Sequence, residues 1–110
     1  MIAKTLLDYL DSHLDVPVRM EAPEQTAGYV LIDQTGSSRT NHIITTTFAI
    51  QSYGASLYDA MVLNESVKEA MVGFAELDDV TRVELDTDYN FTNTTTKQYR
   101  WQAVYSITHY

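Results

Sequence analysis

Hydrophobic and polar residues alternate in the closing stretch KQYRWQAVYSITHY (97–110), with Trp101 and Tyr105 on the apolar parity. Successive side chains of a strand point to opposite faces of its sheet, so this two-residue period predicts a half-buried β-strand. Residues 80–91 alternate in the same way, and the polar stretch TNTTT (92–96) separates the two segments. Together they predict an antiparallel hairpin.

Two other segments have the three- and four-residue apolar spacing of amphipathic helices. In residues 2–14 the apolar stripe consists of Ala3, Leu6, Leu7, Leu10 and Leu14. The second segment begins at Ser56, a residue type preferred at helix N-caps, with Asp59 as the acidic partner of a capping box. Its stripe consists of Leu57, Ala60, Leu63, Val67, Ala70, Met71 and Phe74. Each segment therefore predicts a helix with one buried face.

Three further strands are expected between these helices. Residues 16–20 alternate, and Pro17 favours a sheet edge or a strand start for them. Residues 28–33 (GYVLID) are apolar on both parities, which is typical of a strand covered on both faces. Residues 42–53 (HIITTTFAIQSY) are rich in the β-branched residues that strands prefer.

A polar segment with a glycine turn signal joins the last two of these strands, and we expect it to be a mobile loop at the tip of an extended hairpin. It consists of Gln34, Thr35, Gly36, Ser37, Ser38, Arg39, Thr40 and Asn41. The full element order is then αβββαββ. This order predicts a single α+β domain over residues 1–110, a mainly antiparallel sheet with two helices packed on it.

The composition restricts the classes of function. The chain has 110 residues, no cysteine, and a net charge of −8 from seven basic and fifteen acidic residues. Binding to nucleic acid backbones needs clustered positive charge, which this sequence lacks. No apolar run is long enough to cross a membrane, and charges occur too early at the N-terminus for a signal peptide. We therefore expect a protein of the cytoplasm where it is made.

No set of residues predicts catalysis. His13, His42 and His109 are scattered, without the spacing of a zinc site. Nucleophile elbows, phosphate-binding loops and dinucleotide fingerprints are missing from the sequence. The chain is expected to be no enzyme and to use no metal and no cofactor.

Three carboxylates, Glu84, Asp86 and Asp88, share one parity of a predicted strand. Hard cations usually take their ligands from a curled loop, so a straight strand favours a solvated outward face over a metal site. If TNTTT alone forms the loop, Asp88 lies opposite Arg100, and acid pairs with base across the hairpin.

The second predicted helix carries one anomaly, because Tyr58 and Val62 fall nearly opposite its core stripe. They are four residues apart and therefore in contact on a helix surface. A neighbouring aromatic and aliphatic pair predicts an interaction surface, with an ordinary surface pair as the alternative.

The element order, the polar hairpin segment and the closing YRWQAVYSITHY resemble the tail terminator (tail completion) proteins of long-tailed bacteriophages. In many related proteins the last strand has a similar sequence, matched here by Tyr99, Arg100, Gln102, Ala103, Val104 and Tyr105. Trp101 occupies the central aromatic place, and the opening LLDYLDSHLDVPV is similar to the first helix and strand of the family.

The resemblance implies a homo-oligomeric ring, typically a hexamer, that caps the tail tube, stops its polymerisation and provides a surface for head–tail joining. Its partners would be the tail tube protein and head–tail connector proteins, with DNA passing through the lumen and no membrane involved. It would reside at the tail end or neck of the virion, and in the host cytoplasm during assembly. No catalytic residues accompany this family.

On this hypothesis Tyr58 and Val62 belong to a subunit contact, and residues 34–41 order on the tail or connector. Glu84, Asp86 and Asp88 are candidate lining of the lumen. Two alternatives remain open: another neck or head-closure component, and a small non-enzymatic ligand-binding or regulatory module.

Overall fold

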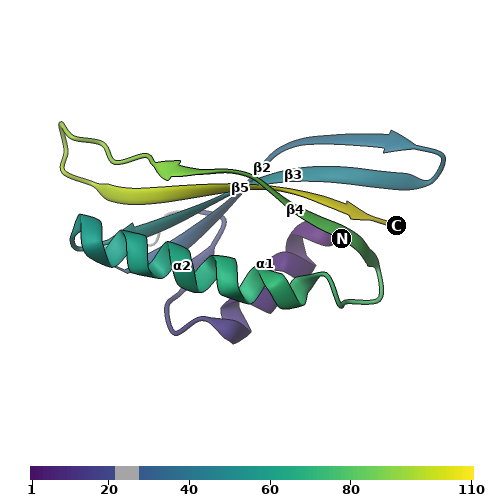
Figure 1. Cartoon of the computed structure of the whole chain (residues 1–110), viewed down its shortest axis with the longest axis horizontal. Helices are drawn as coiled ribbons and strands as arrows, with labels where there is room; N and C mark the ends of the chain where they lie inside the picture. The colour runs from purple at the N-terminus through teal and green to yellow at the C-terminus, as the bar shows by residue number, and fades with distance from the viewer. Residues whose placement is uncertain (22–27) are drawn as a thin grey trace.

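The computed structural model describes residues 1–21 and 28–110 (Figure 1). Its elements are α1 (Ile2–His13), β1 (Val18–Arg19), β2 (Tyr29–Thr40), β3 (Ile43–Gly54), α2 (Leu57–Phe74), β4 (Val80–Asn90) and β5 (Tyr99–His109). The order αβββαββ and the α+β class predicted from the sequence are thus confirmed.

The strands form one twisted sheet in the order β1-β2-β3-β5-β4. Every neighbouring pair is antiparallel except the short β1 with β2. The edge position of β1 agrees with the expectation from Pro17. Both helices pack on the same face of the sheet, and none of the described residues forms a layer on the opposite face, called here the uncovered face (Figure 1).

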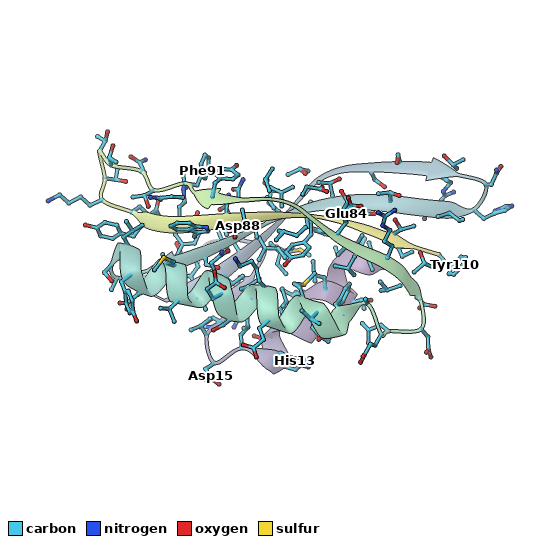
Figure 2. All side chains as sticks on the ribbon, viewed as in Figure 1. His13, Asp15, Glu84, Asp88, Phe91 and Tyr110 are labelled. Carbon is cyan, nitrogen blue, oxygen red and sulfur yellow. The ribbon has the colours of Figure 1, made fainter. Side chains whose placement is uncertain are left out.

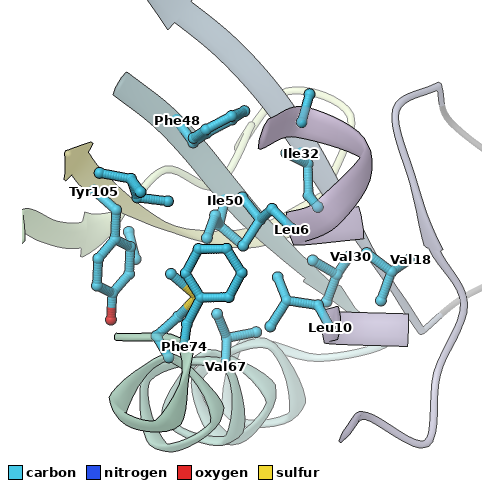
Figure 3. Packing of buried hydrophobic residues seen from close by; sticks show 14 of the residues in the cluster. Leu6, Leu10, Val18, Val30, Ile32, Phe48, Ile50, Val67, Phe74 and Tyr105 are labelled. Atoms are coloured by element: carbon cyan, nitrogen blue, oxygen red, sulfur yellow. The ribbon is translucent and has the colours of Figure 1, made fainter. Parts of the chain in front are cut away.

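The hydrophobic core lies between this sheet and the two helices (Figure 3). The helices contribute Leu6, Leu10, Val67, Met71 and Phe74 to it, and the sheet contributes Val30, Ile32, Phe48, Ile50, Ala103, Tyr105 and Ile107. The apolar parity of the closing strand therefore faces the helices, as predicted. Because β5 pairs with β3 on one side and β4 on the other, the end of the chain is held along its whole length.

The prediction of a mobile loop over residues 34–41 is wrong. Gln34 to Thr40 continue β2, and only Asn41 and His42 turn the chain, both at positive φ (49° and 70°). Two consecutive residues in the left-handed region form the two-residue turn that connects the strands of a tight β-hairpin. Asn is one of the residue types that tolerates positive φ. Gly36 marks a bulge in the ladder instead of a turn. The serine and threonine residues of this segment therefore belong to a polar strand, although their polarity had predicted a loop.

The expectation that residues 28–33 are covered on both faces is also wrong. Val30 and Ile32 point to the helices, but Tyr29 lies on the uncovered face. It is buried there because its ring stacks on Tyr53 at 4.5 Å between centroids. Tyr29, on the second apolar parity of residues 28–33, is thus covered by an aromatic neighbour within the same sheet. Among the described residues, no second layer covers it.

The predicted register of the last hairpin fails as well. Asp88 lies opposite Ala103, and Arg100 does not pair with it. The connection is longer than TNTTT, since an isolated bridge joins Asn93 to Gln98 within it. A register shift between Leu85 and Thr87 then reduces the offset from three residues at Asp88 to two at Leu85, which lies opposite Tyr105. An odd shift of register moves a side chain to the other face of a sheet.

Candidate subunit-contact surface

Helix α2 carries apolar side chains that stay exposed within the described part of the chain. Ser56 caps it by accepting a hydrogen bond from the Asp59 N–H at 3.1 Å, as the sequence predicted. Its buried face holds Ala60, Asn64, Val67, Met71 and Phe74. Its exposed positions include Leu57, Tyr58, Met61, Val62 and Val72. Asp59, Glu65, Ser66 and Glu69 are exposed as well, so the outer side of α2 mixes apolar and polar residues, whereas the outer side of an ordinary surface helix is mainly polar.

Tyr58 and Val62 lie on the outer side of α2, nearly opposite its buried face, and Tyr58 is 68% exposed. They border a groove of about 530 Å³ between α2 and the segment after α1. Leu14 and Val16 supply apolar lining, and Asp15 lies beside them. The exposure predicted for the Tyr58–Val62 pair is therefore confirmed, whereas its role in a contact stays a prediction.

Val72 lies on the side of α2 toward β4 and is 76% exposed. A second groove of about 470 Å³ runs there between α2 and the edge strand β4. Its lining consists of Lys68, Met71, Val72, Ala75, Val83, Leu85 and Tyr105. The sequence reasoning missed this groove, although the helical spacing already places Val72 on the same flank as Met61.

Asp88 lies at the centre of a polar cluster between the last hairpin and α2 (Figure 2). Its carboxylate accepts hydrogen bonds from Asn64 Nδ2 (2.8 Å), Lys68 Nζ (2.5 Å) and Trp101 Nε1 (2.7 Å). The Lys68 ammonium also contacts Glu65 at 2.8 Å. Asp88 thus ties the hairpin to α2, and its assignment to an outward acidic face was wrong.

These contacts shift the pKa values of Asp88 and Lys68. Burial by itself raises the pKa of Asp88, but the hydrogen bonds from Lys68, Asn64 and Trp101 outweigh it and lower the pKa below its ordinary value. The hydrogen bonds from Lys68 to Asp88 and Glu65 raise the pKa of the lysine. Each shift favours the charged form that the ion pair requires.

The other two acids of the predicted acidic face do lie on the uncovered side of the sheet. Glu84 is opposite Ser106 in the ladder and pairs with Arg82 at 2.9 Å. Asp86 accepts a hydrogen bond from the Ser106 hydroxyl. Only these two of the three carboxylates therefore share a surface.

The uncovered face also carries an aromatic and cationic cluster at its other end. The Arg100 guanidinium lies 4.4 Å from the ring centroid of Phe91 and 5.9 Å from that of Tyr53. Tyr53 in turn stacks on Tyr29. Arg100 thus contacts aromatic rings instead of the acids of β4, because the register differs from the predicted one.

A row of hydrogen bonds crosses the same face. The Tyr53 hydroxyl donates to Gln51 Oε1 at 2.7 Å, and Gln51 Nε2 donates to Gln102 Oε1 at 2.8 Å. Gln102 Nε2 continues the row to the Tyr89 hydroxyl. Gln102, on the polar parity of the closing strand, is therefore ordered within the sheet and buried.

The hairpin residues 34–41 extend along one end of the molecule, and all of them are exposed (Figure 1). The three histidines lie apart: His13 stacks on Tyr9, His42 forms the hairpin turn, and His109 bonds to Thr46 at 2.9 Å.

Within residues 1–21 and 28–110 there is no group of three His, Asp or Glu side chains placed to hold a metal ion. In the same part of the chain, neither helix is long and apolar enough to cross a membrane. No known family model matches this chain, and no curated protein is significantly similar to it.

Proposed function

We propose that this protein terminates a bacteriophage tail. Copies of the chain assemble into a closed ring, typically a hexamer, which binds the end of the tail tube and stops its polymerisation. The ring then presents a surface to the head–tail connector proteins. It acts at the tail end or neck of the virion without catalysis or cofactor, and DNA passes through its lumen without specific binding.

The observation that carries this proposal is the exposed apolar surface of α2. Tyr58 and Val62 line one groove beside this helix, and Val72 lines another. Several large exposed apolar side chains on one helix are a feature of surfaces at which soluble proteins associate. A structural protein that functions only when assembled has a reason to retain it.

The resemblance of the closing strand to phage tail terminators supports the same proposal and specifies the assembly. Two polar surfaces fit the role. The exposed hairpin residues 34–41 provide a contact for the tube or the connector. Glu84 and Asp86 on the uncovered sheet face are suited to line a lumen, because carboxylates repel the phosphates of passing DNA. Asp88 has no part in that lining.

The test is a tube-growth assay. Tail-tube subunits are polymerised with increasing amounts of this protein, and tube lengths are measured by electron microscopy. We expect tubes to shorten and to carry a ring at one end. Unchanged lengths at saturating protein would exclude tail termination.

Tyr58→Asp and Tyr110→Asp are the paired variants for this assay, because the two tyrosines are equally exposed at 68% and 69%. Tyr58→Asp should lose capping, whereas Tyr110→Asp, away from α2, should retain it. Binding to isolated connector with no binding to the tube would instead support the alternative of a head-closure component.

A further inference from the structure

We infer that the free edge of β4 accepts a short extended strand from a partner protein. This strand places alternate apolar side chains in the groove between β4 and α2, and its intervening side chains are basic. The source of such a strand rests on the proposed function, since a tail terminator meets other proteins of the tail and the connector.

Strand β4 is the last strand of the sheet, so one row of its backbone groups has no partner among the described residues (Figure 1). The Phe91 N–H donates to the Arg100 carbonyl, so the even-numbered residues of β5 are those that bond to β4. Glu84 lies opposite one of these residues and bonds inward. Its neighbours Val83 and Leu85 therefore direct their N–H and C=O groups out of the sheet.

These outward groups lie beside an apolar groove of about 470 Å³. Val83 and Leu85 line it on the strand, and Val72 lines it on the helix. Tyr105 also lines the groove, and its hydroxyl forms no hydrogen bond with any described residue, although the side chain is buried. An added strand would direct the side chains opposite Val83 and Leu85 to the same face of the sheet, and so into the groove. Peptides that bind by strand addition use such backbone groups for affinity and side-chain pockets for specificity.

Two register shifts limit the length of the added strand. They lie between Val80 and Arg82 and between Leu85 and Thr87. A bulge disrupts the regular row of backbone groups on an edge. The regular outward row is therefore confined to residues 82–85, which fits a short segment instead of a long strand.

The charges along this edge select a basic partner. Four carboxylates and two cations lie on β4 and the adjoining turn of α2: Glu65, Glu84, Asp86, Asp88, Lys68 and Arg82. Carboxylates are thus in excess even with every ion pair formed. The residue of the added strand opposite Glu84 points to the uncovered face, where Asp86 also lies. A lysine or arginine there pairs with acids, and opposite charges across a strand pair are favourable.

A second copy of this chain has no strand of that chemistry to offer. Apolar–basic–apolar runs occur twice in the sequence, as VRM (18–20) and YRW (99–101). Val18 is fully buried in the core of its own copy, and β5, which carries YRW, already has a strand on each side. The added strand therefore belongs to a different protein.

The test adds a short synthetic peptide that alternates valine and lysine to isotope-labelled protein and follows amide hydrogen exchange by NMR. Exchange at Val83 and Leu85 should slow by about tenfold when the free peptide is at about ten times its Kd. Exchange at Glu84, which already bonds to β5, should not change. A peptide that alternates valine and glutamate should have no effect. Unchanged exchange at Val83 and Leu85 with the lysine peptide at millimolar concentration would overturn the inference.

Val72→Lys and Val62→Lys are the paired variants, because both residues are exposed on α2 and only Val72 lines this groove. Val72→Lys removes apolar lining and repels the peptide, so protection of Val83 and Leu85 should be lost. Val62→Lys should retain it. Loss in both variants or in neither counts against the groove. Protection that appears without peptide as the protein concentration rises would assign the edge to a second copy.

These results are distinguishable from the fate of the proposed function. Protection of Val83 and Leu85 by the peptide together with unchanged tube growth would retain the strand site and reject tail termination. Capping of tubes by wild type with no protection by the peptide would retain tail termination and reject the strand site.

Discussion

Single residues show where an alternating pattern is informative and where it misleads. The exposure of Tyr58 and Val62 followed from helical angles alone, because a regular helix fixes the direction of every side chain. The direction of Asp88 did not, because it depends on a bulge and a loop length that the pattern does not encode. Trp101 is likewise only partly buried and uses its ring N–H to hold Asp88, so its truncation should cost less than that of a core tryptophan.

Replacing the Asp88 carboxylate should destabilise the fold. In Asp88→Asn the lysine loses its charged partner, and part of the hydrogen-bond set from Asn64 and Trp101 is lost. Leaving such groups unsatisfied costs about 1–3 kcal/mol, measured as the free energy of unfolding in urea. Asp86→Asn on the exposed side of the same strand is the control and should change stability by less than about 0.5 kcal/mol. If Asp88→Asn and Asp86→Asn lower the free energy of unfolding equally, the hydrogen bonds around Asp88 do not stabilise the fold.

The same pair of charges predicts a pH dependence. The pKa of Asp88 is lower in the folded chain than in the unfolded chain, so its contribution to stability is complete above the unfolded value. It is lost as the pH falls through the folded value. The stability difference between wild type and Asp88→Asn should therefore shrink as urea titrations move from neutral pH towards pH ~2. A difference that stays constant over this range would contradict the assigned role.

Elements were predicted more completely than the connections between them. Both helices and the strands of the last hairpin followed from periods of 3.6 and 2 residues, whereas β3 followed from its β-branched residues and the start of β2 from its apolar run. Residues 34–40 were misassigned because a Ser/Thr-rich strand exposed on both faces has no apolar parity to identify it. The groove beside Val72 was missed for a different reason: it depends on how closely β4 approaches α2, which is a tertiary property.

In the β2–β3 hairpin, a glycine substitution should stabilise the protein at the turn and destabilise it within a strand. His42 adopts φ of 70°, a left-handed conformation that glycine takes without strain. His42→Gly should therefore raise the free energy of unfolding by roughly 0.5–1 kcal/mol. Ser38→Gly within β2 should lower it by a similar amount, because glycine weakens strand interiors. Destabilisation by both variants would argue that this segment is not the tight hairpin described.

The junction between β3 and α2 depends on Gly54. A methyl group there would lie 2.5 Å from the backbone nitrogen of Ala60, which cannot move without shifting the helix. Gly54→Ala should therefore lower the free energy of unfolding by about 1–3 kcal/mol or more. Gly36→Ala is the matched control, since nothing lies within 4 Å of the added methyl group, and it should be nearly neutral. Both are measured by urea denaturation.

At the scale of the whole molecule, the chain has a well-covered core on one side of α2 and uncovered apolar surface on its flanks. Ala60, Val67 and Phe74 are fully buried within the monomer, so the fold does not need a partner to close its core. The exposed residues Tyr58 and Val72 therefore add little to the stability of a single copy. Covering them should stabilise the protein further in a way that depends on concentration.

Thermal unfolding can measure this dependence. Association that favours the folded chain stabilises it by mass action, so the Tm of wild type should rise with chain concentration. Tyr58→Asp should remove the rise while leaving the stability at low concentration within about 0.5 kcal/mol of wild type, because surface substitutions seldom do more. Tyr110→Asp, equally exposed but at the chain end beside Asp79 and outside both grooves along α2, should keep the full concentration dependence. A Tm of wild type that is independent of concentration would show that the flanks of α2 do not associate, whereas a loss of the rise in both variants would place the contact elsewhere.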